Sequence, residues 1–399
     1  MPARSGEVGP GSVARGGRSI RRNARRVAAA CVSAVAVVSV AACSSSSGPA
    51  ASSGSASSGS AQGANVAAAK AALAPFTIPP TSFPVTEPLM EKLPAGKKFA
   101  YLQCSTPICA VVGTFVQQAV KAIGGTMTVV NAGSTAQTAQ AAASSVLALR
   151  PDAVLLGAID PALFGSGLKT LADGGVKLVS LQIDKDVKPF GITFNYLGTD
   201  LSHRNGKLLA DWVIANKGAH ADAVLYSLPA LDISAPVKTA FENEMKTNCP
   251  SCKVRVVPID VRTIGTTSAT TVVTDLQAHQ DTNVAVFVSL SAAAGLPAAM
   301  KAAGLSITTV GFGPTVGNLQ DIKNGGLTAA LDIDFPVSTW TAVDAAARLL
   351  EGAQPTASEQ AGEVPEQFLG QKDITFDPTH GWLAFPDYAQ RFAQLWHTS

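Results

Sequence analysis

The chain has 399 residues, of which 47% are hydrophobic and 15% are charged, and its formal net charge at pH 7 is +2. This length excludes a single small core and is sufficient for two ordinary α/β domains behind an N-terminal extension. No basic stripe runs along the chain, so its charge gives no support for nucleic acid as a partner.

The N-terminal region has the layout of a secretory signal. A basic segment precedes the uncharged run from Val27 to Ala42, which is shorter than the roughly 20 apolar residues that a membrane-spanning helix needs. The run ends in Val-Ala-Ala-Cys43, which resembles the lipobox of bacterial lipoproteins, where the cysteine becomes acylated. We therefore expect residues 1–42 to be a signal peptide and Cys43 to carry a lipid that anchors the protein to the membrane outside the cell. A cleaved signal with a chance cysteine is the alternative, and Arg21-Arg22 leaves the general secretory and twin-arginine routes both open.

A Gly/Ala/Ser-rich stretch follows Cys43 and continues to about Asn65. Such a composition cannot bury enough apolar surface to fold, so it predicts a flexible tether. The Pro-rich run from Pro75 to Pro94 predicts a stiffer, extended approach to the folded part. We therefore expect residues 43–94 to be a lipidated tether and a Pro-rich linker.

Four cysteines remain once Cys31 is assigned to the signal and Cys43 to the lipid, and four cysteines allow three pairings. Outside the cytosol, two local disulfides are the simplest outcome. A zinc site needs four convergent ligands, and one of the two pairs has the wrong spacing for it. A redox CxxC motif usually opens a helix, whereas this one follows a helix. We therefore predict two structural disulfides, Cys104–Cys109 and Cys249–Cys252.

From Lys97 onward, short apolar runs alternate with Ala-rich amphipathic segments. The runs predict buried strands at 99–102, 127–130, 153–156 and 176–179, and the segments predict helices at 110–123, 134–149 and 161–172. Glycine pairs after two of these helices are typical of left-handed caps. Strand, helix and strand at this spacing indicate right-handed crossovers and a parallel sheet.

The same pattern then begins again after a helix at 200–216. Strands are expected at 223–226, 254–258, 284–288 and 308–312, with helices at 234–246, 268–279 and 292–303. A helix at 336–350 has no place in this second order, so the chain is expected to return to the first domain there. The predicted fold class is α/β, with two doubly wound parallel-sheet lobes joined by a multi-strand hinge. Lobe 1 is assigned to 95–198 plus 335–370, and lobe 2 with the C-terminal tail to 199–334 plus 371–399.

Several motifs fall in the order and spacing of one known family. They are Leu102-Gln-Cys-Ser-Thr-Pro107, Leu149-Arg-Pro-Asp-Ala-Val-Leu-Leu156, Gly174-Gly-Val-Lys-Leu-Val-Ser-Leu181 and Tyr196-Leu-Gly-Thr-Asp200. From Lys97 to about Phe376 the chain resembles the type I periplasmic binding proteins of the ribose-binding kind, the substrate-binding subunits of ABC sugar importers. The resemblance implies a monomer that captures a small molecule outside the membrane and delivers it to an ABC permease.

Ligands of open parallel sheets bind outside the carboxyl ends of the strands. At these positions the family holds sugars with aromatic rings and with Asn, Asp and Arg, whereas this chain has Thr106-Pro-Ile-Cys109, Gln182-Ile183, Leu290-Ser291 and Gly313. Each buried hydroxyl without a partner costs about 1–3 kcal/mol, so one hypothesis is a ligand less polar than a pentose or hexose. The alternative is that other polar groups, Ser105, Asp184, Arg262 and Ser289, surround a sugar. We expect the ligand to be held by residues from this set: Gln103, Ser105, Thr106, Ile108, Asp160, Gln182, Asp184, Leu228, Leu231, Arg262, Ser289, Leu290, Ser291, Gly313, Asp334 and Phe335.

No catalytic constellation stands out in the sequence. The five histidines are scattered, and none lies near a strand end together with a candidate nucleophile. Carboxylates such as Asp160, Asp184 and Asp260 follow strands, but contact with a ligand or helix capping accounts for them more simply than acid–base catalysis. We therefore expect no enzyme, no cofactor and no metal site. A lipoprotein that senses a ligand and signals to a membrane receptor is the alternative to transport, and the sequence does not separate the two.

Overall fold

The structure is a computed structural model that describes residues 63–399. The expected signal peptide, the lipidated Cys43 and the first part of the expected tether lie outside the described residues. Within the described part of the chain, no helix is both long and apolar enough to span a membrane.

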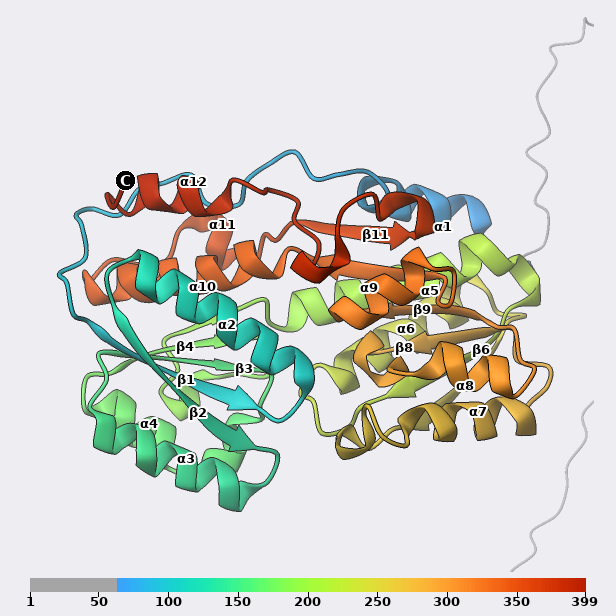
Figure 1. The fold of residues 1–399 in the computed structure, drawn as a ribbon, viewed down its shortest axis with the longest axis horizontal. Coiled ribbons are helices and arrows are strands. Elements are labelled where there is room, and N and C mark those ends of the chain that lie inside the picture. The colour runs from blue at the N-terminus through green and yellow to red at the C-terminus, as the bar shows by residue number, and fades with distance from the viewer. Residues whose placement is uncertain (1–62) are drawn as a thin grey trace, which may run out of the picture. The chain divides into compact units, whose positions relative to one another are not determined.

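The first sheet is parallel and confirms the strands predicted for lobe 1 (Figure 1). Its order is β2-β1-β3-β4-β5. The edge strand β5 was not predicted, because three residues are too few to form a recognisable pattern. The strands are β1 (Lys98–Cys104), β2 (Thr126–Gly133), β3 (Ala153–Gly157), β4 (Lys177–Leu181) and β5 (Phe194–Tyr196). The helices of this lobe are α2 (Pro107–Ala122), α3 (Ala136–Leu149), α4 (Gly167–Asp173) and α10 (Phe335–Leu350).

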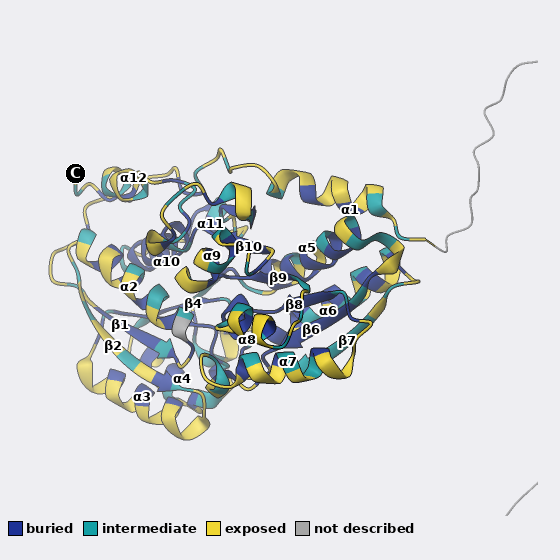
Figure 2. Ribbon diagram, turned by 45° about the vertical axis from the view of Figure 1, so that its right-hand side comes forward, coloured by how far each residue is buried: buried dark blue, intermediate teal, exposed yellow. Residues whose placement is uncertain are grey.

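The second sheet has the order β11-β10-β9-β8-β6-β7, and only β11 runs antiparallel to its neighbour. The central strands are buried on both faces (Figure 2), as their continuous apolar sequences predict. The strands are β6 (Asp222–Ser227), β7 (Lys253–Pro258), β8 (Val284–Phe287), β9 (Thr308–Phe312), β10 (Ala329–Ile333) and β11 (Glu366–Gly370). The helices are α5 (Thr199–Lys217), α6 (Ser234–Asn248), α7 (Ser268–Ala278), α8 (Leu296–Ala302) and α9 (Val316–Lys323).

The chain crosses between the two sheets three times. It crosses after β5, again after β10, where α10 returns to pack on α2, and a third time between the short helix α11 (Ala357–Gln360) and β11. Residues 366–370, which we expected in lobe 1, therefore belong to the second sheet, where β11 covers the edge of β10. The C-terminal helix α12 (Tyr388–Leu395), expected with lobe 2, packs on α10 and α2 of lobe 1.

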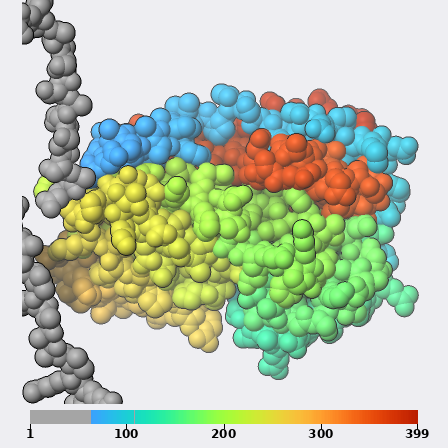
Figure 3. All heavy atoms as spheres, turned by 180° about the vertical axis from the view of Figure 1, so that it is seen from behind, coloured from blue at the N-terminus to red at the C-terminus, as the bar shows by residue number. Residues whose placement is uncertain are grey.

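Residues 63–94 are folded onto the body, so the part of the expected linker that the structure describes is not a tether. We call this segment the N-terminal strap. Its helix α1 (Val66–Leu73) packs on α5 and α6 of the second lobe, and the strap then continues to the first lobe. There Val85, Leu89 and Leu93 are buried, and the Leu89 N–H donates to the Leu395 carbonyl at 2.9 Å. The strap, coloured blue in Figure 3, runs along one edge of the described body. The three buried residues Val85, Leu89 and Leu93 are four apart, and the Pro-rich composition around them concealed this spacing.

A buried carboxyl in the second lobe makes the stability depend on pH. Asp211 lies on α5 and is 4% exposed, and its burial, together with the nearby charge of Glu244, raises its pKa to about 7. The folded protein therefore binds this proton more tightly than the unfolded chain. The resulting stabilisation is present below about pH 4 and is lost as the pH rises through about 7. We expect Asp211→Asn to raise the free energy of unfolding at about pH 8 by about 1–3 kcal/mol and to flatten its decline from about pH 5, measured by urea unfolding.

The matched control for this prediction is Asp281→Asn, which changes an exposed aspartate of the same lobe. It should leave the pH profile of stability unchanged. A loss of stability at about pH 8 in the Asp211 variant would show that the ionised carboxylate is stabilising and would contradict the prediction.

Candidate ligand-binding cleft

The carboxyl ends of strands from both sheets converge on one cavity, as the strand-tip rule predicts. The space that a sphere the size of water can enter is about 50 Å³, and all of the empty space out to the open side amounts to about 660 Å³. The first lobe contributes the ends of β1, β3 and β4 and the start of α2, and the second lobe contributes the loops after β6, β8 and β9. The start of α10, at a hinge crossing, supplies another wall.

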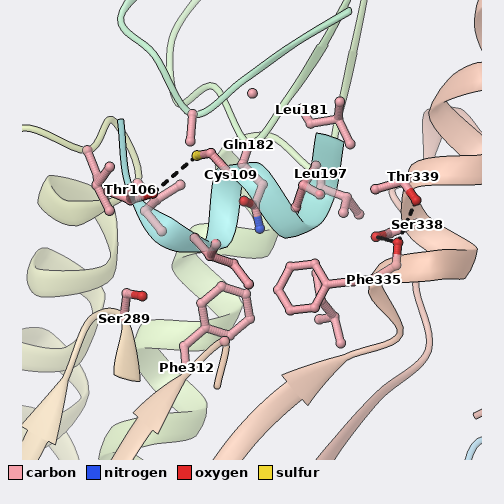
Figure 4. Close-up of a pocket in the computed structure, with 18 of the residues that line it drawn as sticks. Thr106, Cys109, Leu181, Gln182, Leu197, Ser289, Phe312, Phe335, Ser338 and Thr339 are labelled. Carbon is pink, nitrogen blue, oxygen red and sulfur yellow. Dashed lines mark hydrogen bonds between the residues drawn. The ribbon is translucent and has the colours of Figure 1, made fainter. Parts of the chain in front are cut away.

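The walls of this cavity are mainly apolar. Phe312 and Phe335 both line the cavity, and Ile108 and Val112 form part of the wall on α2. Figure 4 shows the two phenyl rings below the first turns of α2. Among the described residues, no aspartate, glutamate, lysine, arginine or histidine lines the cavity. An ionic ligand would therefore lose its hydration here without gaining a charged partner.

Most hydroxyl groups in the wall are already bonded to the protein. Ser338 and Thr339 both donate to the Phe335 carbonyl, at 3.0 and 2.8 Å. The hydroxyl groups of Ser289 and Ser291 share a hydrogen bond of 2.9 Å. These bonds satisfy the groups internally and leave them less available to a ligand.

Gln182 is the polar side chain best placed to meet a ligand. Within residues 63–399, no protein group hydrogen-bonds to its carboxamide, which Figure 4 shows reaching into the cavity. The residue has a φ of 57°, in the left-handed region, and its N–H donates to the Tyr196 carbonyl at 2.9 Å. A carboxamide offers both donors and an acceptor, so one residue can serve either kind of polar group on a ligand.

A disulfide forms part of the cavity wall. Cys104 ends β1 and pairs with Cys109 in the first turn of α2, while Cys249 pairs with Cys252 in the second lobe, in agreement with the predicted pairing. The Thr106 hydroxyl contacts both sulfurs of the first bridge, at 3.4 and 3.2 Å. The bridge therefore closes the 104–109 loop around Thr106. No group of His, Cys, Asp and Glu side chains within 63–399 has the arrangement of a metal site.

The structure brings some of the predicted site residues together and separates others. Those that line the cavity are Thr106, Ile108, Gln182, Leu231, Ser289, Gly313 and Phe335. Those that do not are Gln103, Ser105, Asp160, Asp184, Leu228, Arg262, Leu290, Ser291 and Asp334.

The residues outside the cavity have other surroundings. Leu228, Leu290 and Ser291 are buried behind the wall. Arg262 is exposed and pairs with Asp260, which follows the edge strand β7. Asp160 pairs with Lys185 at 2.9 Å.

Asp334 is a hinge residue whose oxygens all face the protein. One oxygen accepts the Val337 N–H at 3.0 Å and caps α10; the other accepts the Ala384 and Phe385 N–H groups, at 2.8 and 3.2 Å. Burial raises its pKa to about 6. The side chain is fully buried, so it holds the C-terminal segment on the hinge and does not reach the cavity.

Several lining residues were missed because the strand-tip rule stops where a helix begins. Val112, Ser338 and Thr339 lie in the first turns of α2 and α10. The signal that could have found Val112 is its spacing of four from Ile108, which places both on one helix face. Phe312 was assigned to the strand 308–312 and not to the loop behind it, and Leu197 follows the short strand β5, which was not predicted.

Comparisons with known proteins agree with this architecture. Residues 99–354 match the family model described as periplasmic binding protein domain, so the chain belongs to that family of solute-binding proteins. The family implies a location outside the cytoplasm. No curated protein matches the chain in sequence.

Solved structures share the fold at low sequence identity. The Caulobacter myo-inositol binding protein bound to myo-inositol is 17% identical with a TM-score of 0.60, covering 73% of this chain and 97% of that one. The 5-methylthioribose transporter solute binding protein from Thermotoga lettingae, with 5-methylthioribose, is 15% identical with a TM-score of 0.64, covering 79% and 100%. A putative LacI transcriptional regulator from Bacteroides fragilis is 13% identical with a TM-score of 0.60, covering 70% and 98%. These likenesses confirm the predicted type I periplasmic binding protein fold.

Proposed function

We propose that the protein is a lipid-anchored, extracytoplasmic solute-binding protein that captures a small neutral molecule between its lobes and delivers it to an ABC importer. The observation that carries the proposal is a single cavity walled by strand ends of both sheets. A ligand there touches both lobes, so it binds the closed form more tightly and shifts the lobes towards it. The lipobox-like Cys43 supports the anchor, and the family supports transport.

The lining supports a ligand less polar than a free sugar. Of the polar groups that offered the alternative, Ser105, Asp184, Arg262 and Ser289, only Ser289 lines the cavity. The Thermotoga neighbour is bound to 5-methylthioribose, a sugar that carries a methylthio group. The ligand proposed for this chain has an apolar face or substituent that rests on Phe312 and Phe335, and a polar edge that meets Gln182.

Native mass spectrometry of the purified protein tests this function. We expect a small neutral compound to be released on collisional activation, and calorimetry should then show that this compound binds. At a hundredfold excess over its dissociation constant it should stabilise the fold by about 2.7 kcal/mol. Micromolar binding of an unmodified pentose or hexose would refute the less polar ligand. The capture function itself fails if no small molecule from the native source binds in the cavity.

A further inference from the structure

The two lobes touch each other beside the cavity through one aspartate. Asp232, in the loop after β6 of the second lobe, has both carboxylate oxygens bonded to the first lobe. One oxygen accepts the Asp184 N–H at 2.6 Å, and the other lies 3.1 Å from Nζ of Lys185. Separation of the lobes on this side would break both contacts, because the partners lie on different lobes.

The segment that Asp232 holds is the loop that presents Gln182 to the cavity. Asp184 and Lys185 follow Gln182 directly after β4. Gln182 has the left-handed backbone conformation, which is less favourable for a residue with a side chain. Contacts two and three residues further along restrict how this loop can relax. Asp232 therefore links the closure of the lobes to the placement of the carboxamide.

The environment of these charges favours a strong contact. The Asp232 side chain is only 9% exposed, whereas Lys185 is 33% exposed and also pairs with Asp160 of its own lobe at 2.9 Å. Hydrogen bonds to a carboxylate withdrawn from water are stronger than those between neutral groups. When the lobes separate, Lys185 keeps Asp160 as a partner, and Asp232 exchanges two protein partners for water.

We propose that Asp232 is a positioning residue, an interlobe latch that holds the cleft closed in the ligand-free protein and orders the 182–185 loop for binding. The latch rests on the proposed function only in that the cavity beside it is the binding site. Because part of the ligand-free protein is already closed, less free energy is needed to close the cleft when a ligand binds. The apparent affinity of the ligand therefore rises with the closed fraction.

Small-angle X-ray scattering of the ligand-free protein tests the latch. Asp232→Ala should shift the equilibrium towards the open form by about tenfold, seen as an increased radius of gyration. Asp232→Asn should lie between this variant and the wild type, because its remaining oxygen still accepts the Asp184 N–H. Raising the salt from about 0.05 M to about 0.5 M should open the wild type, since the Lys185 contact is partly exposed, and should change the alanine variant less.

The matched control is Asp260→Ala, which breaks an ion pair with Arg262 inside the second lobe. It should scatter like the wild type. If Asp232→Ala does not fold, judged by thermal melting, Lys185→Met breaks the same interlobe ion pair from the other lobe. Scattering identical to the wild type in the folded Asp232 or Lys185 variant, or an equal shift in the control, would overturn the latch. Any co-purified compound is first removed by unfolding and refolding, and no ligand is added back, so a protein that captured no solute would fail the proposed function without altering this result.

Discussion

Replacing Asp344 with alanine is expected to lower the free energy of unfolding by about 3–5 kcal/mol. Asp344 lies on α10, is fully buried, and accepts from Arg348 Nε and Trp396 Nε1, each at 2.6 Å. Burial raises the pKa of both Asp344 and nearby Glu359, and of the two carboxyls Asp344 is the closer partner of Arg348 Nε, at 2.6 Å against 3.5 Å. The substitution leaves a buried guanidinium and a buried indole N–H without this partner.

This network joins segments that are far apart in the sequence. Arg348 also donates to the carbonyls of Glu87 and Pro88 in the strap, and Trp396 stacks on Trp340 with ring centroids 5.2 Å apart. Losing Asp344 therefore loosens the strap, α10 and the C-terminal helix together, so the cost exceeds that of one hydrogen bond.

Urea unfolding of three variants separates the contributions. Trp396→Phe keeps an aromatic ring and removes the indole N–H, so it should cost about 1–3 kcal/mol. The double variant Asp344→Ala/Arg348→Met should recover part of the stability lost by Asp344→Ala, because it removes the buried guanidinium that has lost its closer carboxylate and keeps Glu359 at 3.5 Å. A loss below about 1 kcal/mol for Asp344→Ala, or no recovery in the double variant, would contradict this account.

Replacing Val112 with tryptophan is expected to weaken ligand binding at least about 100-fold, equivalent to about 2.7 kcal/mol. Val112 lies on α2 and is half-buried in the cavity wall, so an indole there occupies the space that the ligand needs. Valine and tryptophan have similar helix propensities, so the helix itself should tolerate the change. Calorimetry with the compound identified by native mass spectrometry measures the loss.

The control for this variant is Gln117→Trp, which places the same side chain on an exposed position of α2. It should bind like the wild type. If Val112→Trp retained affinity within about threefold, a difference of only about 0.7 kcal/mol, the ligand would have to bind elsewhere.

The lobes could be predicted from the sequence because buried parallel strands produce short, continuous apolar runs. Ala153–Gly157 and Val284–Phe287 are buried throughout, and each was recognised on that basis. The edge strand β11 was missed because its pattern is not apolar: Glu366 and Gln367 are buried, and Glu366 pairs with Arg204 at 3.1 Å. Tertiary contacts stabilise that strand, and such contacts leave no local pattern in the sequence.

The sequence predicted the location of the cavity more accurately than the residues that line it. The position of a strand end determines where the backbone leaves the edge of the sheet, so Gln182, Ser289 and Phe335 were predicted correctly. The strand end does not determine whether a carboxylate there already bonds to another part of the protein. Asp160 forms an ion pair with Lys185, and Asp334 accepts hydrogen bonds from backbone N–H groups. Lys185 lies tens of residues from Asp160, as Ala384 and Phe385 do from Asp334, so these contacts become visible only in the folded structure.

The N-terminal strap has a mechanical consequence for the two lobes. It is attached to α5 and α6 at one end and to the C-terminal helix at the other, and between them Pro75–Pro84 passes beside the 363–366 hinge segment. A connection fixed at both ends holds the lobes at a nearly constant separation along that edge. Rotation is then confined to an axis close to the strap, and the largest displacement occurs at the edge furthest from it. Opening is therefore a rotation about an axis beside the strap, and both the length of the strap and the hinge limit how far the lobes can separate.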